Sequence, residues 1–292
     1  MEAGEVFGLL GPNGGGKTTL FRILSTLLAP TRGRARICDH DVVTEPDAVR
    51  RRIGIVFQAP SLDGKLTVRE NMRHQGHLYG LHGKALEATI DDMLGRVRMR
   101  ERESERVEHL SGGLKRRVDL AKGLMHRPRL MMMDEPTTGL DPAARIDLWN
   151  HVRESRERDG LSVLVTTHLM EDADRCDRLL IIDRGKIVAL DTPEALRDSV
   201  GGDVIVARTR APEELARAIR DRFHEEAEVL VDTVRVRRSR GHEFVPLLFD
   251  AFPGQIDAVS VGKPTLEDVF IQRTGHGLGE DEARPHQEGQ QK

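Results

Sequence analysis

The stretch GPNGGGKTT at residues 11–19 decides the fold of this chain, because it matches G-x-x-x-x-G-K-[ST], the spacing of a phosphate-binding loop. An apolar run at residues 6–10 leads into it as a predicted strand, and apolar residues recur at helical spacing over residues 20–28. A strand, a glycine-rich turn and a helix start therefore follow one another as the chemistry requires. The stretch predicts an α/β fold around a nucleoside triphosphate, but it does not separate a kinase, a GTPase and a transport ATPase.

The glycines of this loop allow consecutive backbone N–H groups to face an anion, and the helix that follows adds its positive end. Lys17 is expected to reach the terminal phosphates, and the Thr18 hydroxyl is expected to bind Mg²⁺. The alternative is a glycine-rich turn with an incidental lysine. The strand and helix around the loop argue against it.

Composition limits the remaining possibilities. The 292 residues include 45 basic and 48 acidic side chains, a net charge of -3 that carries no nucleic-acid signature. The two cysteines, Cys38 and Cys176, are far apart and suggest neither a disulfide framework nor a zinc site, so a reducing cytoplasm is expected. No run approaches the roughly 20 apolar residues that cross a bilayer. The N-terminus does not read as a signal peptide, and a membrane role would need a separate membrane-embedded partner.

Polar residues follow three predicted buried strands. Asp134 and Glu135 come after the strand at 130–133, where an α/β sheet places its ligand chemistry. Asp134 fits a Mg²⁺-linked carboxylate, and Glu135 fits a base that polarises the attacking water. The alternative is a strand end solvated by two acids. Gln58 and His168 also follow apolar runs; alone, each reads as a loop or packing residue, but both positions fall at the expected ligand edge.

Two further helix starts are predicted by their capping residues. Ser111 can cap a helix that ends before Pro128, and Asp141 can cap another with Pro142 at its first position. Ser111 with Gly112 and Gly113 also forms a possible anion site. An N-cap preceded by a loop is the simpler alternative, yet a second phosphate-binding helix start in one domain needs an explanation.

A different pattern begins after residue 202. Alternating strand and helix signals over residues 203–273 predict a small α+β module, and the polar tail at 275–292 is expected to be disordered. Arginines at 235, 237, 238 and 240 could bind phosphate or lipid, but an exposed basic strand edge, which discourages aggregation, is the favoured interpretation.

With GPNGGGKTT, Gln58, LSGG, MMMDEP, TGLD and His168 in this order, the chain resembles the ATP-binding subunit of an ABC transporter. The resemblance covers residues 3 to 200. It implies a P-loop NTPase fold with a RecA-like core, an ABC ATPase domain at 1–200 and a helical subdomain at about 59–127. The module at 203–273, with its PTLEDVF segment, resembles that of the daunorubicin-resistance-type (ABC-2 type) multidrug export ATPases, which pair with separate permeases.

The resemblance assigns roles at the site. Thr18 and Gln58 would bind Mg²⁺, with Asp134 acting through water. Glu135 would be the general base, and His168 would contact the terminal phosphate. Ser111 and Gly113 would contact the ATP of a second subunit, and Asp141 would communicate across the dimer, which explains the two anion sites. The residues expected to contact the nucleotide are Gly11, Pro12, Asn13, Gly14, Gly15, Gly16, Lys17, Thr18, Thr19, Gln58, Ser111, Gly112, Gly113 and Asp141.

Two features depart from the family pattern. Leu114 stands where the family usually has the glutamine of LSGGQ, and we expect weakened tuning rather than lost function. The aromatic residue that usually stacks on adenine from an upstream first strand has no room before Gly11. Stacking contributes about 1–3 kcal/mol, roughly ten- to hundredfold in affinity. We expect poorer base selectivity and one strand fewer, and we hypothesise a start that is too late or a truncated gene.

The resemblance implies an ATPase homodimer that binds ATP and Mg²⁺ at the cytoplasmic face of the cell membrane, where it drives a separate permease. The exported compound is expected to be a drug, an antibiotic or lipid-like. One alternative is a soluble ABC-type ATPase of DNA repair or of the ribosome. However, fewer than 100 residues separate Lys17 from Leu110, too few for a long coiled coil, and the chain has one cassette rather than two. A weakened or inactive regulatory module is the other alternative.

Overall fold

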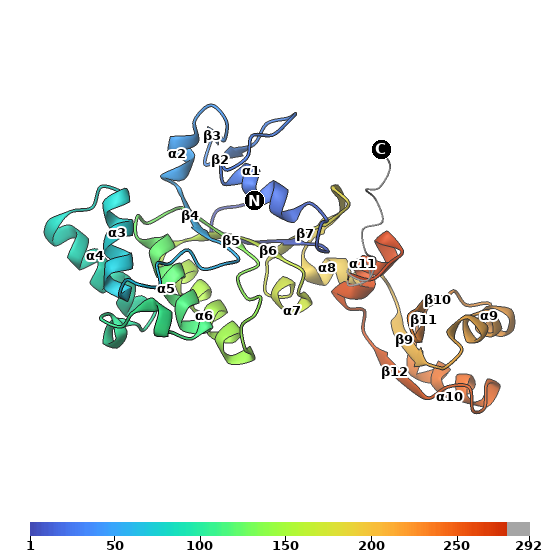
Figure 1. Cartoon of the computed structure of the whole chain (residues 1–292). Helices are drawn as coiled ribbons and strands as arrows, with labels where there is room; N and C mark the ends of the chain where they lie inside the picture. The colour runs from blue at the N-terminus through green and yellow to red at the C-terminus, as the bar shows by residue number, and fades with distance from the viewer. Residues whose placement is uncertain (279–292) are drawn as a thin grey trace, which may run out of the picture. The chain divides into compact units, whose positions relative to one another are not determined.

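The computed structural model describes residues 1–278 of the chain. Contacts within it define two compact units, the first ending at Arg178 and the second beginning at Leu179 (Figure 1). The first unit contains every residue of the predicted site. The division predicted near residue 200 stays a prediction.

The centre of the first unit is a run of parallel strands in the order β4 (Ile53–Val56), β5 (Leu130–Asp134), β6 (Ser162–Thr167) and β1 (Val6–Leu10). All residues of β1 and β5 are buried, as expected for parallel strands with both faces covered. Figure 1 shows helix α1 (Lys17–Leu24) on one face and α5 (Gly112–Leu124) with α6 (Pro142–Asp159) on the other. The predicted α/β fold is confirmed, and the carboxyl ends of these strands meet at one edge.

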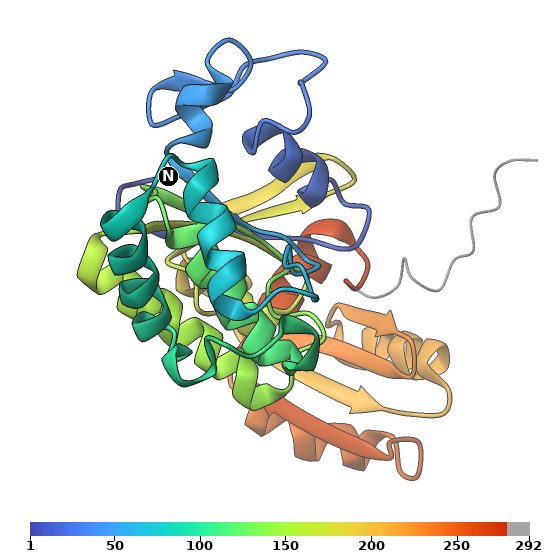
Figure 2. The same cartoon turned by 60° about the vertical axis from the view of Figure 1, so that its left-hand side comes forward.

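Helices α3 (Val68–Leu78) and α4 (Gly83–Arg96) pack together and against α5, as the teal and green helices in Figure 2 show. Thr67 and Glu70 form a capping box at the start of α3. The shared interior of these helices is apolar and buried; it includes Met72, Leu86, Ile90, Met93, Leu94, Val118, Ala121 and Met125.

The smaller elements of the first unit complete its connections. They are the strand pair β2 (Arg36–Ile37) and β3 (His40–Asp41), the helices α2 (Pro46–Arg50) and α7 (Met170–Ala173), and the 3₁₀ turns η1 (Arg100–Arg102) and η2 (Val107–His109). None of the helices within residues 1–278 combines the length and apolar character needed to cross a bilayer.

Among its described residues, the second unit contains an antiparallel sheet, four helices and all but the first residue of a hairpin. The hairpin is formed by β7 (Arg178–Asp183) and β8 (Lys186–Asp191). The sheet has the order β10 (Ala227–Leu230), β11 (Thr233–Arg238), β9 (Asp203–Arg208) and β12 (Ala258–Gly262). Its apolar core lies under α9 (Pro212–Phe223) and α10 (Gly241–Ala251). The last helix, α11 (Leu266–Thr274), instead contacts α8 (Pro193–Asp198) and β8.

The expectation of an exposed basic strand edge in this sheet is wrong. Strand β11 is an inner strand, between β10 and β9. The four arginines are neutralised by nearby acids: Arg235 contacts Asp268 and Glu267, Arg237 contacts Glu228, Arg238 contacts Glu225, and Arg240 contacts Glu243. The arginines of this segment therefore take part in ion pairs with nearby acids and do not mark an open edge.

The tail expected to be disordered begins within the described residues. His276 Nε2 lies 3.2 Å from Asp183 Oδ2, and the His276 ring meets Phe270 edge-on. Residues 279–292 lie outside the described residues.

Candidate active site

The glycine-rich loop between β1 and α1 holds Lys17 in a buried position. Gly14 and Gly16 have φ of 77° and 108°, a backbone region that favours glycine, and Gly16 is the N-cap of α1. Lys17 is 3% exposed, and its Nζ donates to the carbonyl oxygens of Gly11 (2.8 Å) and Pro12 (3.0 Å). Burial lowers the pKa of Lys17, and the Glu135 carboxylate opposes this shift. The Lys17 side chain is therefore hydrogen-bonded to backbone carbonyls of its own loop.

Glu135 occupies a strained backbone position directly after β5. Its φ of 43° lies in the left-handed region, which is uncommon for a residue with a long side chain. Two contacts to β6 hold it there, because the Glu135 N–H donates to the Thr166 carbonyl (3.1 Å) and to Thr166 Oγ1 (3.0 Å). The turn directs the buried Glu135 carboxylate toward the loop that carries Lys17.

Four side chains from different segments meet at the Glu135 carboxylate. Lys17 Nζ lies 3.4 Å from Oε1. Gln58 Nε2 and Thr138 Oγ1 donate to Oε2 at 3.4 Å and 3.5 Å. His168 Nδ1 lies 3.2 Å from Oε2, although without the alignment of a hydrogen bond. The structure thus brings together the predicted residues of the loop, of β5 and of the ends of β4 and β6.

Asp134 lies next to this cluster and is tied to the same threonine. Thr166 Oγ1 donates to Asp134 Oδ1 at 2.5 Å, and both side chains are buried. Thr18 is exposed in the first turn of α1. Together with Gln58 these residues offer a carboxylate, a hydroxyl and an amide oxygen, the hard oxygen donors that Mg²⁺ prefers alongside phosphate oxygens. Within residues 1–278, no cluster of three His, Cys, Asp or Glu side chains is placed to hold a metal ion.

The second predicted anion site lies at the start of α5 and is exposed. Ser111 is the N-cap, and its Oγ accepts from the Leu114 N–H at 3.4 Å. Across the described residues, no hydrogen bond or ion pair joins Ser111 to the Glu135 cluster. Gly113 instead faces α6, where a Cβ on it would lie 2.8 Å from Ala144 Cβ. The start of α5 therefore packs beside the start of α6.

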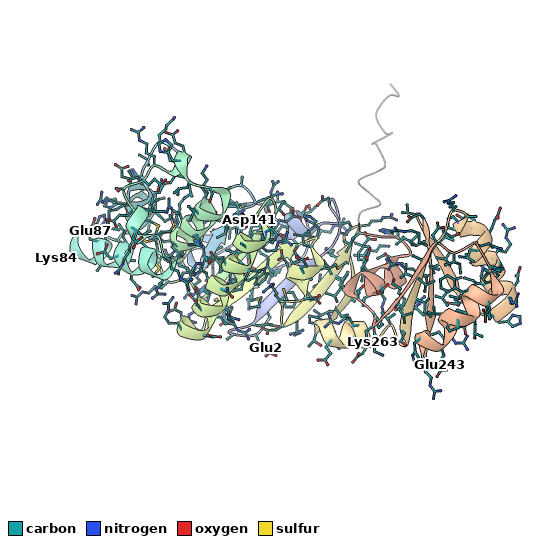
Figure 3. The ribbon with its side chains drawn as sticks, turned by 90° about the horizontal axis from the view of Figure 1, so that it is seen from below. Glu2, Lys84, Glu87, Asp141, Glu243 and Lys263 are labelled. Atoms are coloured by element: carbon teal, nitrogen blue, oxygen red, sulfur yellow. The ribbon has the colours of Figure 1, made fainter. Side chains whose placement is uncertain are left out.

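Asp141 caps α6 as predicted, since its Oδ1 accepts from the Ala144 N–H at 2.9 Å, and Pro142 is the first helical residue. Asp141 is exposed and is labelled in Figure 3. Its local role is a helix cap. Its exposure leaves the outer carboxylate oxygen accessible to another chain.

The structure adds a supporting residue that sequence reasoning missed. Asp172 in α7 is fully buried, and it accepts from Thr137 Oγ1, from Trp149 Nε1 at 2.8 Å and from Thr167 Oγ1 at 3.4 Å. Thr137 follows Glu135 in the chain, and Thr167 precedes His168. One carboxylate therefore ties the two loops of the site to α6. In the sequence, Asp172 is marked only as an acid four residues after His168. That spacing does not distinguish it from a solvated helix residue.

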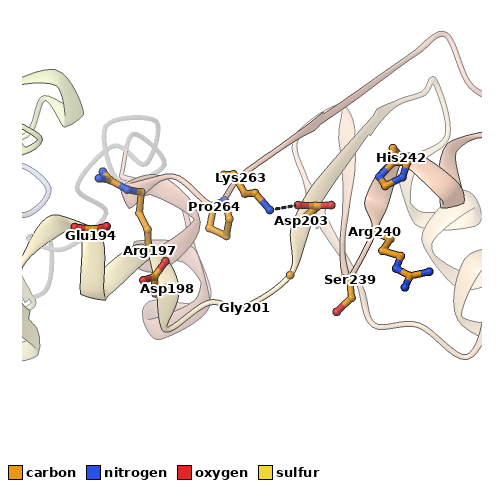
Figure 4. Close-up of a pocket in the computed structure, with 11 residues that line it drawn as sticks. Glu194, Arg197, Asp198, Gly201, Asp203, Ser239, Arg240, His242, Lys263 and Pro264 are labelled. Carbon is orange, nitrogen blue, oxygen red and sulfur yellow. Dashed lines mark hydrogen bonds and ion pairs between the residues drawn. The ribbon is translucent and has the colours of Figure 1, made fainter.

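The second unit contains a cavity of about 880 Å³ between α8, the start of β9 and the end of β12 (Figure 4). Its lining is charged, and Lys263 Nζ lies 2.8 Å from Asp203 Oδ1. None of the predicted site residues lines this cavity.

Comparison with known proteins agrees with this geometry. The family model described as ABC transporter matches residues 1–138. The chain is 39% identical to the daunorubicin resistance ATP-binding protein DrrA3 of Streptomyces coeruleorubidus, an alignment that covers 94% of this chain and 89% of that protein. It is also 39% identical to the Nod factor export ATP-binding protein I of Bradyrhizobium diazoefficiens, over 95% of this chain and 90% of that protein.

Solved structures share the fold. One is cbiO1 from Clostridium perfringens, part of the ABC transporter complex cbiONQ, with a TM-score of 0.63 and 26% identity over 77% of this chain and 86% of that one. Another is the dimeric post-hydrolysis state of the ATP-binding cassette MJ0796 bound to ADP and Pi, with a TM-score of 0.59 and 27% identity over 66% and 87%. Sequence, fold and site agree, and the chain belongs to the ABC transporter family as one of its ATP-binding ATPase subunits.

Proposed function

We propose that this chain hydrolyses ATP within a homodimer and so drives a separate membrane permease that exports a drug, an antibiotic or a lipid-like compound. The observation that carries the proposal is the convergence of Lys17, Gln58 and His168 on the Glu135 carboxylate. A base, a cation and two polar side chains from four segments meet at one edge of the sheet, where α/β folds bind ligands.

The chain's own groups supply the chemistry. Residues 11–19 offer backbone N–H groups and the end of α1 to a triphosphate, and Lys17 exchanges its carbonyl partners for phosphate oxygens. Glu135 accepts a proton from the attacking water, and His168 contacts the terminal phosphate. Thr18, Gln58 and Asp134 would hold Mg²⁺, which when bound neutralises charge that develops on the phosphates.

The exposed second anion site supports the proposal of a homodimer. Ser111, Gly112 and Gly113 lie at a helix N-terminus, where Ser111 and Gly112 are exposed. We propose that they bind the ATP held by a second copy, with Asp141 communicating across the interface. Each nucleotide then touches two subunits, and hydrolysis removes the contacts made through the terminal phosphate.

The names of two relatives support a proposal for the cellular setting. One is named for daunorubicin resistance and the other for Nod factor export. We propose that this chain likewise works at the cytoplasmic face of the cell membrane through its permease. The ATPase domain would span residues 1–200, and the module at 203–273 would be an accessory domain.

Substituting the proposed base tests the ATPase assignment. Glu135→Gln keeps the size of the side chain and removes its basicity, so hydrolysis should fall by about 10²- to 10⁴-fold while a non-hydrolysable ATP analogue still binds. Glu157→Gln on the exposed face of α6 is the matched control and should hydrolyse ATP normally. Undiminished hydrolysis in Glu135→Gln would rule out this residue as the base.

The dimer is tested with the same variant. ATP should convert Glu135→Gln from monomer to dimer in sedimentation velocity, because the nucleotide persists at the interface. Adding Ser111→Arg places a bulky cation at the exposed helix start and should prevent this dimer. A dimer that forms equally well with Ser111→Arg would contradict the proposed interface.

A further inference from the structure

One face of α5 carries a stripe of three charged residues, Arg116, Asp119 and Lys122, spaced three apart. All three contact the segment that follows β4, residues 57–61. Arg116 donates to two successive carbonyl oxygens, that of Phe57 at 2.5 Å and that of Gln58 at 2.7 Å.

The other two residues of the stripe hold the far end of the same segment. Asp119 Oδ1 accepts from Ser61 N at 3.3 Å and from Ser61 Oγ at 3.0 Å. Lys122 Nζ donates to the Ser61 carbonyl oxygen. The segment carrying Gln58 is therefore bound at both ends by one helix.

These contacts lie in an environment that is unfavourable for charge. Arg116 is 3% exposed and Asp119 is 1% exposed. Burial lowers the pKa of Arg116 and raises the pKa of Asp119. The pair is loose, with Arg116 Nη1 and Asp119 Oδ2 separated by 3.5 Å, and neither Arg116 Nε nor Asp119 Oδ2 has a hydrogen-bond partner within the described chain. A buried ion pair whose atoms are incompletely hydrogen-bonded is weak evidence for stability. The two hydrogen bonds from Arg116 to backbone oxygens are therefore not explained by stability alone.

The C-terminal part of α5 is anchored to the sheet at a separate point. A Cβ on Gly54 in β4 would lie 2.4 Å from the Gly123 carbonyl oxygen, so helix and strand are in backbone contact there. The helix thus runs from its exposed start at Ser111, past its hold on the Gln58 backbone, to a close contact with β4. No flexible linker separates these points.

We propose that Arg116 is a positioning residue that fixes the Gln58 backbone to α5, so that the Ser111 end of the helix and the Gln58 side chain move together. The proposal rests on the proposed function, in which Ser111 contacts the second subunit's ATP and Gln58 binds the metal of its own. Arg116 itself touches no nucleotide; it acts through Gln58. Occupation of the neighbouring site would in this way be transmitted to the metal site of this subunit.

A double-mutant cycle between Arg116 and Gln58 tests the proposal. Arg116→Met should lower kcat for ATP by about 10- to 100-fold and raise the Mg²⁺ concentration needed for half-maximal rate, as is usual when the support of a metal ligand is removed. In a Gln58→Ala background the same substitution should change kcat by less than about twofold, because its route of action is already gone. Arg117→Met is the matched control: Arg117 is the next residue on α5, but it pairs with Asp147 of α6 at 2.6 Å and should leave the Mg²⁺ dependence unchanged.

Hydrogen exchange provides a readout that does not depend on activity. In the nucleotide-free full-length chain, amide exchange of residues 57–61 should be faster in Arg116→Met than in Arg117→Met. Arg116→Lys keeps the charge but cannot span two carbonyls, so it should show the same change more weakly. This variant also replaces Arg116→Met if the latter fails to fold, as checked by its thermal unfolding.

The outcomes separate the two proposals. If Gln58→Ala has no effect on the Mg²⁺ dependence, the assigned role of Gln58 fails, and with it the proposed metal site. Suppose instead that Gln58→Ala changes the Mg²⁺ dependence, but Arg116→Met lowers kcat by the same factor in the Gln58→Ala background as in the unaltered chain. Arg116 then acts elsewhere, and the positioning role is wrong. Unchanged exchange at 57–61 in both Arg116 variants also overturns it.

Discussion

Replacing Thr166 with valine tests how the two acids of the active site are held. Thr166 is fully buried on β6, and its single hydroxyl serves both acids: it donates to Asp134 Oδ1 at 2.5 Å and accepts from the Glu135 N–H at 3.0 Å. Valine has nearly the same shape, so Thr166→Val removes the hydroxyl without opening a large cavity.

The expected loss can be worked from these contacts. A hydrogen bond to a charged group contributes about 1.5–3 kcal/mol, and Asp134 remains buried after the substitution. The Glu135 N–H keeps the Thr166 carbonyl at 3.1 Å, so this donor adds little to the loss. For a unit of this size each kcal/mol lowers Tm by about 2–4 °C. Thr166→Val should therefore lower Tm by about 3–12 °C.

The same change should reduce catalysis, because Asp134 loses the hydroxyl that orients it and Glu135 keeps only one of its two hydrogen bonds to Thr166. We expect kcat for ATP to fall by about 10- to 100-fold, the usual effect of losing a residue that orients a metal or catalytic group. The assays are thermal unfolding followed by circular dichroism and phosphate release at saturating ATP and Mg²⁺.

Thr209→Val is the matched control. Thr209 is also buried, but its hydroxyl donates to the neutral Gln255 carbonyl at 2.6 Å in the second unit. It should lose about 0.5–1.5 kcal/mol and keep normal hydrolysis. If Thr166→Val unfolds and hydrolyses ATP like the unaltered chain, or no worse than Thr209→Val, the hydroxyl does not support the two acids and the reasoning is refuted.

Three other predictions concern the same unit. Gly113→Ala should destabilise it by about 1–3 kcal/mol through the 2.8 Å approach to Ala144 Cβ, and Ala144→Gly in the same chain should restore Tm; no restoration would mean that the crowding lies elsewhere. Burial lowers the pKa of Lys17 in the free chain, and a bound phosphate would raise it. ATP affinity should therefore be full at pH values below the lowered pKa and should fall as the pH rises through it. Calorimetric titrations from neutral to alkaline pH that show no fall in affinity would contradict this. Trp149→Phe removes the indole N–H donated to Asp172 and should lose about 1.5–3 kcal/mol in thermal unfolding, whereas an unchanged Tm would show that Asp172 does not need this donor.

Local features of the fold could be predicted because their partners are close in sequence. The caps at Ser111 and Asp141 each bind a backbone N–H three residues ahead, so residue type and spacing suffice to place them. The hairpin of β7 and β8 is a local feature of the same kind, since its two strands are neighbours in the chain.

Prediction from the sequence fails where the interacting residues are far apart in the chain. The arginines of β11 were interpreted as a free edge, because nothing within the strand shows that β9 and β10 flank it. The stripe on α5 was missed as well. Arg116 and Asp119 fall among the apolar positions of a helix that reads as ordinary packing, and their partners lie about 60 positions earlier in the chain.

The amino-acid sequence alone determined that residues 11–19 form an anion-binding turn between a strand and a helix, since a glycine-rich loop and a helix N-terminus need no distant residue to do so. Only the tertiary structure decided that Gln58 and His168 meet at Glu135 and that Arg116 holds the Gln58 backbone. The physical reason is that these contacts depend on the order of parallel strands in the sheet. That order is set by packing over the whole unit rather than by hydrogen bonds between near neighbours.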